Sequence, residues 1–396
     1  MTTQNLSDTL QIEPIVEAVL RGLTLEGIGD AKVRVGVRVN PFDFPSVGTR
    51  FLRVTYTSSG QANISYFLKR FDPATYCPPS NGRGPLSWRR SKTRLPPSQL
   101  EHLYLNLYRQ EGCSVPASRV IDDLTLAMED CGAETLEERL RDKAPDEQEK
   151  ILAALIPQQA RIAIAGRKIK LPSDGAERVN LYSDLSRDFT LHFKYWRRAA
   201  SGEETEQFLD KTRFFREGYS GKKQYFLGDN ATFHILFRNN TSHPFMWVDL
   251  ERIKEGTQTR EPAGIYFSPE SNIGFEAMER LLYACRTSEE EIEEGKTRKG
   301  NPIDEKAWRE YLKDFYKVAV VECFRRGTKI RELEMFYPEI YERFTRRHTG
   351  FRNAFSRYQE KIAGTVVKVN VNGLYNDKEK EAFKIGGDAI LDLMSK

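Results

Sequence analysis

The hydrophobic pattern of this chain changes its period part-way along, and this change limits the folds it can adopt. Apolar side chains first alternate with polar ones, which is typical of half-buried β-strands, over residues 33–39, 50–56 and 64–71. Beyond Gly132 the apolar positions recur at helical spacing instead. The sequence therefore predicts a small antiparallel β-rich part followed by a larger, mainly helical part.

Further signals mark the ends of single elements. Ser98 is expected to cap a helix, with Glu101 completing a capping box, and Gly112 is expected to end that helix. A strand pair is expected between Ser114 and Asp130. Other helices are expected at 12–23, 147–164, 203–215, 273–285, 305–326 and 336–355, and a solvated loop or frayed helix end at 289–301.

Composition narrows the class of protein. A chain of 396 residues is long for one simple core, and we expect two domains, 1–131 and 132–396. No apolar run approaches the ~20 residues of a membrane helix, and the start lacks a secretory pattern. The five cysteines are scattered without metal-ligand spacing, as in reduced cytoplasmic proteins. A net charge of +4 permits an anionic substrate, and we expect no nucleic-acid partner.

Two aspartates in the helical part enclose the pattern of a short hairpin. Asp229 follows an apolar run, His234 comes five residues later, and Asp249 ends a second apolar run. Phosphoryl transfer needs one carboxylate to orient the attacking hydroxyl and a second, with a nearby ligand, to hold Mg²⁺. An ordinary polar hairpin between two strands would give a similar pattern. The segments that precede the hairpin are therefore needed to distinguish a phosphoryl-transfer site from an ordinary hairpin.

Those segments, together with the aspartates, resemble motifs of the protein-kinase-like fold, specifically its bacterial small-molecule and lipid-sugar kinases. Residues 66–69, Tyr-Phe-Leu-Lys, resemble the strand whose lysine binds nucleotide phosphates, and Glu101 resembles the helix glutamate that pairs with it. Residues 126–132 resemble the hinge of aminoglycoside phosphotransferases, and 228–229 and 248–252 the catalytic loop and the metal-binding segment. The resemblance covers roughly residues 50–255.

The resemblance implies an α+β, two-lobed fold with a small antiparallel N-lobe that binds nucleotide and a helical C-lobe. It also implies a kinase that uses ATP and Mg²⁺, with Asp229 as the catalytic carboxylate. Lys69 would hold the phosphates, supported by Glu101. The remaining roles are adenine binding by the backbone of Met128, Glu129 and Cys131, and metal binding by Asp249 and His234, with Glu251 as a further candidate.

His234 bears on the acceptor. Kinases that phosphorylate heptose or 3-deoxy-octulosonate in the lipopolysaccharide core often have histidine at this position, and a neutral imidazole can ligate a metal. His234 could instead pack against Phe233 and Ile235. The resemblance implies a sugar or lipid-sugar acceptor in lipopolysaccharide biosynthesis and peripheral association with the inner membrane. The basic segment Arg83–Arg94, which includes Trp88, is either a patch for anionic headgroups or a solvated loop.

Departures from the family pattern keep two alternatives open. The long segment between Lys150 and Phe226 is nearer to the aminoglycoside and choline kinase arrangement, which favours another small hydroxyl acceptor. Leu227 stands where a histidine usually precedes the catalytic aspartate, and no Gly-x-Gly-x-x-Gly is present in the first strands. A pseudokinase that binds nucleotide without transfer would also fit these departures.

Overall fold

The computed structural model describes residues 32–38, 50–57, 64–71, 95–132, 134–170, 202–219, 223–227, 232–238, 244–248, 250, 253–295 and 303–395. Asp229, Asp249, Glu251, the helix expected at 12–23 and the basic segment Arg83–Arg94 lie outside these residues. Contacts divide the chain into two compact units, Met1–Asn106 with Pro116–Cys131, and Leu107–Val115 with Gly132–Lys396.

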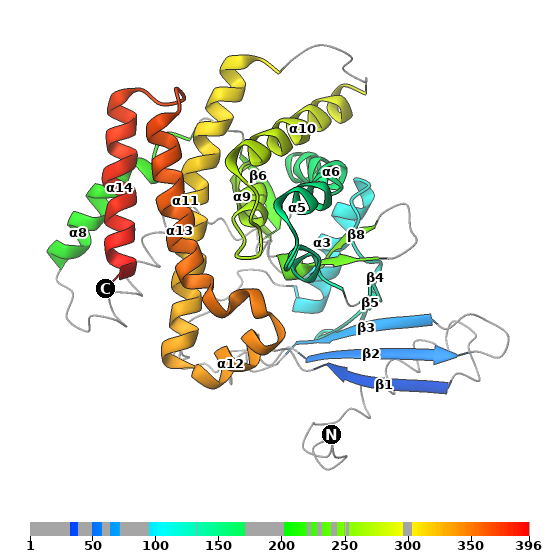
Figure 1. Ribbon diagram of the computed structural model, residues 1–396. Coiled ribbons are helices and arrows are strands. Elements are labelled where there is room, and N and C mark those ends of the chain that lie inside the picture. Colours follow the sequence, from blue (N-terminus) through cyan, green and yellow to red (C-terminus); the bar gives the residue numbers. More distant parts are fainter. Residues whose placement is uncertain are drawn as a thin grey trace. The chain divides into compact units, whose positions relative to one another are not determined.

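The first unit is built on one antiparallel sheet with the strand order β1-β2-β3-β5-β4. Figure 1 shows β1, β2 and β3 side by side, as the alternating sequence pattern predicts. The predicted meander and the predicted strand pair after it are therefore confirmed. The strands are β1 (Lys32–Arg38), β2 (Arg50–Thr57), β3 (Ile64–Arg70), β4 (Ser118–Asp122) and β5 (Thr125–Glu129).

Helix α3 spans Pro97–Gln110, and Gly112 terminates it, as the sequence predicts. The Gly112 amide donates to the Arg109 carbonyl at 2.9 Å, and the Cys113 amide donates to the Tyr108 carbonyl at 3.1 Å. This pair of bonds is a Schellman motif, which satisfies carbonyls that the helix end leaves free. Gly112 has a φ of +77°, a left-handed conformation that glycine adopts without steric cost. Alanine at this position would be strained.

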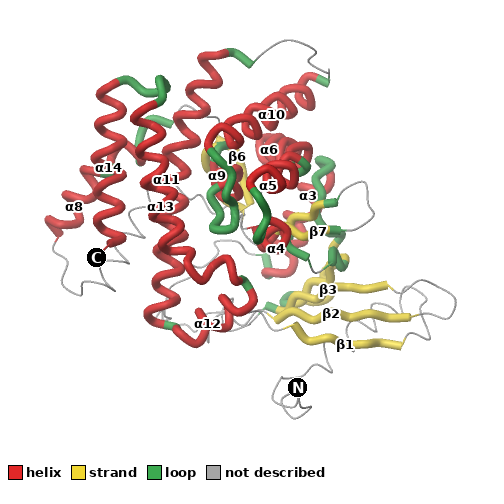
Figure 2. Tube along the Cα trace, viewed as in Figure 1, coloured by secondary structure: helices red, strands yellow, loops and turns green. Residues whose placement is uncertain are grey.

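The second unit is mainly helical (Figure 2). Helices α11, α13 and α14 pack side by side, and α10 packs on α6. Two small antiparallel sheets complete the unit, one formed by β6 (Lys223–Leu227) and β9 (Ile253–Thr257) and one by β7 (Ile235–Phe237) and β8 (Phe245–Trp247). The helices are α4 (Leu136–Leu140), α5 (Pro145–Ala153), α6 (Ile156–Lys168), α8 (Gly202–Lys211), α9 (Arg260–Tyr266), α10 (Phe275–Glu294), α11 (Glu305–Phe336), α12 (Pro338–Arg347), α13 (Ala354–Val371) and α14 (Asp377–Ser395).

Several helical expectations need correction. The stretch 336–355 is divided between α12, a 3-10 turn at Thr349–Asn353 and the start of α13. The stretch 147–164 forms two helices, α5 and α6, because Pro157 occupies the start of α6, where its missing N–H is not needed. Residues 289–294 belong to α10, since Glu289 is buried in an ion pair with Arg167 at 2.9 Å. Helix α11 continues past Arg326 to Phe336, and α14 follows without having been expected.

The cysteines that the structure describes agree with the sequence expectation. Four are free and buried: Cys113, Cys131, Cys285 and Cys323. Burial raises the pKa of Cys113 and Cys323 to about 12, which makes both thiols poor nucleophiles. None of the helices in the described parts of the chain is both long and apolar enough to cross a membrane.

Candidate active site

A buried ion pair lies in the first unit. The Lys69 ammonium of β3 is 2.9 Å from the Glu101 carboxylate of α3. Both residues are almost fully buried, with exposed fractions of 1% and 0%. Strand β3 is held between β2 and β5, where Lys69 is opposite Phe51 and Leu126, so its backbone position is fixed on both sides. The predicted pairing of Lys69 with Glu101 is confirmed.

The predicted capping box at the start of α3 is wrong. The helix begins at Pro97, so Ser98 lies inside its first turn. The Ser98 hydroxyl donates to the Asp122 carbonyl at 2.6 Å, which joins α3 to the end of β4. Glu101 faces Lys69 instead of the helix start. The Ser-x-x-Glu spacing also places both side chains about one helical turn apart on the same face of α3. There they contact the sheet, Ser98 at the end of β4 and Glu101 at β3.

The expected adenine-binding segment is the end of β5. Met128 and Cys131 are buried, and Glu129 is half-buried. The Glu129 amide donates to the Ala117 carbonyl at 2.8 Å, and the Cys131 thiol donates to the Glu129 carbonyl at 3.3 Å. These bonds hold the segment in one conformation up to Cys131, where the first unit ends.

The second unit contains the hairpin expected between the two aspartates. Strands β7 and β8 pair from Ile235↔Trp247 to Phe237↔Phe245, preceded by a 3-10 turn at Thr232–His234. The Val248 amide donates to the His234 carbonyl at 2.9 Å. This bond joins the two ends of the hairpin, between His234 and the residue before Asp249.

His234 also makes the packing contact that its neighbours suggested. Its ring lies 4.3 Å from the Phe233 ring, edge to face, and its side chain is half-buried. Among the described residues no group of three His, Cys, Asp or Glu side chains is placed to hold a metal ion. Asp229 and Asp249 are outside that set, so the predicted metal and catalytic roles stay predictions.

Sequence reasoning missed a buried polar contact beside this hairpin. The Thr232 hydroxyl donates to the Glu270 carboxyl at 3.1 Å, and both residues are buried. Burial raises the pKa of Glu270 to about 7, and the negative charge of Glu137 adds to the shift. No local pattern marks Glu270, because it stands outside any helix and its partner is 38 residues away.

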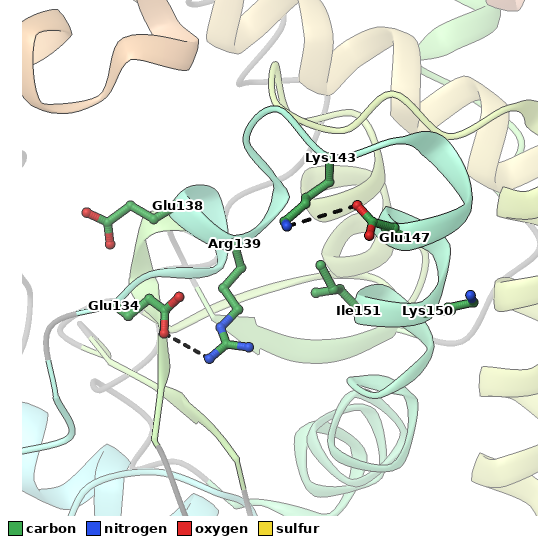
Figure 3. Close-up of a pocket in the computed structure, with 7 residues that line it drawn as sticks. All are labelled: Glu134, Glu138, Arg139, Lys143, Glu147, Lys150 and Ile151. Carbon is green, nitrogen blue, oxygen red and sulfur yellow. Dashed lines mark hydrogen bonds and ion pairs between the residues drawn. The ribbon is translucent and has the colours of Figure 1, made fainter.

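A cavity of about 530 Å³ lies over α4 and α5, lined by Glu134, Glu138, Arg139, Lys143, Glu147, Lys150 and Ile151 (Figure 3). Arg139 pairs with Glu134 at 2.9 Å, and its guanidinium carbon lies 3.2 Å from the centre of the Phe237 ring of β7. The second pair, Lys143 with Glu147, is longer, at 4.0 Å. Because acidic and basic side chains pair across the wall, the cavity favours neither anions nor cations.

Comparison with known proteins identifies the fold. No family model matches the sequence, and no curated protein is detectably similar to it. A choline kinase from Cryptosporidium parvum Iowa II superposes with a TM-score of 0.52 at 11% identity, over 87% of this chain and 94% of that one. A choline kinase from Streptococcus pneumoniae gives 0.49 at 12%, over 90% and 99%, and a Plasmodium vivax ethanolamine kinase gives 0.47 at 10%, over 82% and 83%.

At these identities the likeness concerns the fold alone. The superposition with the Cryptosporidium protein extends over most of both chains. The chain is therefore an α+β protein with a two-lobed, protein-kinase-like fold, as the sequence motifs predict. In such folds the lysine–glutamate pair between a strand and the helix of the small lobe is a recognised part of the phosphate-binding machinery.

Proposed function

We propose that this protein transfers the γ-phosphoryl group of ATP to a hydroxyl group of a small molecule. The observation that carries the proposal is the buried Lys69–Glu101 ion pair at 2.9 Å, on the strand and helix where a kinase-like fold holds its phosphate-binding lysine. A buried ion pair is seldom better for stability than two apolar side chains of similar size. Its presence in this place therefore favours a role in binding.

The nucleotide side of the proposed reaction uses residues of the first unit. Lys69 would bind the phosphates, and Glu101 would keep its ammonium in place. The backbone of Met128, Glu129 and Cys131 would receive adenine. One feature of the described residues supports nucleotide binding: Lys69 is held in position by the opposite charge of Glu101 and by a strand on each side.

The acceptor side uses residues of the second unit. Asp229 would orient the attacking hydroxyl, and Asp249 with His234 would hold Mg²⁺, assisted by Glu251. The support is the 2.9 Å bond between the Val248 amide and the His234 carbonyl, which joins the two ends of the hairpin. The metal would neutralise charge on the phosphates during transfer.

For the acceptor we propose a sugar or lipid-sugar hydroxyl, as in lipopolysaccharide core kinases, with His234 as the supporting feature. An acceptor of the choline or aminoglycoside kind is the second candidate. It is favoured by helix α8, which lies between α6 and β6 as the long segment before Phe226 suggested. The similar fold of the choline kinase from Cryptosporidium parvum Iowa II also supports this second candidate.

The test is ATP turnover with Mg²⁺ by the wild type and by Asp229→Asn, on lipopolysaccharide core sugars, choline and an aminoglycoside. Loss of the carboxylate charge should lower turnover by ~10²- to 10⁴-fold, the usual scale for a positioned acid–base group. Nucleotide affinity should change little. Asp146→Asn, at an exposed position in the first turn of α5, serves as the control and should leave turnover unchanged.

Three outcomes separate the alternatives. Wild-type turnover by Asp229→Asn would remove this residue from the mechanism. Phosphorylation of choline or the aminoglycoside without the core sugars would favour the second candidate. Tight nucleotide binding without turnover on any acceptor would favour a pseudokinase.

Peripheral membrane association is a separate part of the proposal. It rests on the basic segment Arg83–Arg94 with Trp88. If the segment binds anionic headgroups, the protein should sediment with vesicles that contain phosphatidylglycerol, and replacing its arginines by glutamine should abolish this. Equal sedimentation by the glutamine variant would assign the segment to a solvated loop.

A further inference from the structure

The segment Ser268–Asn272 of the second unit is fixed by bonds from two helices. From α5, the Gln148 amide group donates to the Glu270 carbonyl at 2.9 Å, and its oxygen accepts from the Asn272 amide at 2.6 Å. From α13, two cations donate to carbonyls of the same segment, Arg357 to Pro269 at 2.8 Å and Lys361 to Ser271 at 2.7 Å. The backbone on either side of Glu270 is therefore held in place independently of the contacts of the Glu270 side chain.

The Glu270 side chain fits a confined space. Its exposed fraction is 5%, and Gly350 packs against it so closely that a Cβ there would lie 2.9 Å from its Cγ. One carboxyl oxygen accepts the hydrogen bond of the Thr232 hydroxyl at 3.1 Å. Thr232 is fully buried, so water does not compete for this bond.

Thr232 begins the 3-10 turn that ends at His234, and it stands three residues after Asp229. The middle residue of the turn, Phe233, packs among aromatic rings whose centres lie 5.4 to 6.2 Å away, those of Phe344, His348 and Phe351. The turn therefore has an apolar anchor at Phe233 and a polar anchor at Thr232. The polar anchor is the directional one, because a hydrogen bond constrains geometry more narrowly than ring packing.

The charged groups around Glu270 divide into two sets. Glu137 is the acidic neighbour, and it is paired with Arg141 at 2.9 Å and bonded to the ring of His348. Lys361 and Tyr358 of α13 also face Glu270. Burial, and after it the negative charge of Glu137, raises the pKa of Glu270 and favours its neutral form.

We propose that Glu270 is a positioning residue, whose carboxyl fixes the Thr232 hydroxyl and thereby the turn Thr232–His234, which follows Asp229 in the sequence. Its effect on turnover rests on the proposed phosphotransferase function, whereas its effect on the order of the turn does not. A small displacement of a catalytic group is enough to lower a reaction rate strongly. Glu270 itself touches no substrate in this proposal.

The kinetic test compares Glu270→Ala, Glu270→Gln and Thr232→Val with the wild type. Glu270→Ala and Thr232→Val should each lower kcat by roughly 10- to 100-fold, while KM for ATP changes by less than about 3-fold. The double variant should lose no more than either single variant, because both remove the same bond. Glu270→Gln, which can still bond to the hydroxyl, should restore most of kcat. Thr212→Val is the matched control, since Thr212 is equally buried but bonds only within its own segment.

The second readout is hydrogen exchange of residues 232–238, measured well below the unfolding temperature. Exchange should become at least about 10-fold faster in Glu270→Ala and Thr232→Val and stay unchanged in Thr212→Val. Unchanged exchange in folded Glu270→Ala and Thr232→Val would overturn the proposal, even if turnover fell. Faster exchange in a protein whose wild type phosphorylates no acceptor would instead reject the proposed function and leave the positioning role supported. If Glu270→Ala does not fold, Thr232→Val decides alone.

Discussion

Two buried glutamates of the second unit, Glu322 and Glu270, have opposite surroundings. Glu322, on α11, has an exposed fraction of 2% and contacts three guanidinium groups: Arg260 at 2.7 Å, Arg325 at 2.7 Å and Arg326 at 3.4 Å. Glu270 has an exposed fraction of 5%, and its carboxyl accepts a hydrogen bond from a neutral hydroxyl and lies near the negative charge of Glu137. Both carboxyls are buried, but only that of Glu322 has several opposite charges at hydrogen-bond distance.

The difference shows that burial raises the pKa of both carboxyls, and that opposite charges at hydrogen-bond distance decide whether this effect is outweighed. Burial alone would raise the pKa of Glu322, but Arg260, Arg325 and Arg326 outweigh it and hold that pKa well below its usual range. For Glu270 burial dominates, and its pKa rises to about 7. Glu322 thus joins α9 to α11 as a permanent anion, whereas Glu270 changes its charge near neutral pH beside the turn Thr232–His234.

The largest effect expected on stability is that of Glu322→Gln. It should lower the free energy of unfolding at pH 7 by about 3–5 kcal/mol, because buried Arg260 and Arg325 lose the negative charge that they contact. Since the folded-state pKa of Glu322 is lowered, its contribution is present above the unfolded value of 4.5 and is lost as the pH falls further. Urea denaturation at pH 7 and pH 3 should therefore show a smaller deficit at pH 3. An equal loss of unfolding free energy at pH 7 and pH 3 would mean that the arginines do not lower the pKa of Glu322.

Glu101 extends the comparison to a carboxylate that pairs with a lysine. Lys69→Met should destabilise the protein by about 3–5 kcal/mol, because the buried Glu101 carboxylate then loses the opposite charge of Lys69. The double change, Lys69→Met with Glu101→Met, should recover most of that loss and still show no ATP turnover. Calorimetry and a turnover assay on the same samples test both statements. Turnover by the stable double variant would show that the pair serves the fold only.

Glu270→Gln should give the opposite pH dependence from Glu322→Gln. The folded-state pKa of Glu270 is raised, so its contribution is fully present below about 4.5 and is lost as the pH rises through about 7. The variant should exceed the free energy of unfolding of the wild type by less than about 1 kcal/mol at pH 5 and by up to about 3 kcal/mol at pH 9. Unfolding curves at pH 5, 7 and 9 measure this difference. A constant difference across these values would mean that Glu270 stays ionised when buried.

Local sequence patterns were enough for much of the fold and for part of the candidate site. Alternating residues predicted β1 to β3, and Gly112 predicted the end of α3, because strand period and left-handed turns depend on adjacent residues. Lys69 and Glu101 were paired through family resemblance, and the structure places them in contact. The hairpin between Asp229 and Asp249 followed from its two short apolar runs.

What the sequence could not supply depends on partners far along the chain. The Ser98–Glu101 spacing fits a capping box, and only Lys69, in another element, shows that Glu101 has a different partner. Charged residues after Glu289 suggested a solvated loop or a frayed helix end, yet Glu289 itself is buried and paired with Arg167. Glu270 carries no local signal, because its burial follows from the packing of α5, α13 and Gly350 around it.

The smallest effect expected is that of Gly350→Ala, and it tests whether the confined space around Glu270 matters. The new Cβ would lie 2.9 Å from the Glu270 Cγ, so the carboxyl would have to move away from Thr232. The cost should be about 1–3 kcal/mol in the wild type, the usual range for overpacking. In a Glu270→Ala background the same change should cost clearly less, because the side chain that it meets has been removed. Chemical denaturation of the four proteins gives this coupling energy. A coupling near zero would mean that Gly350 does not hold Glu270 in place, and that the bond to Thr232 depends on the fixed backbone of Ser268–Asn272 alone.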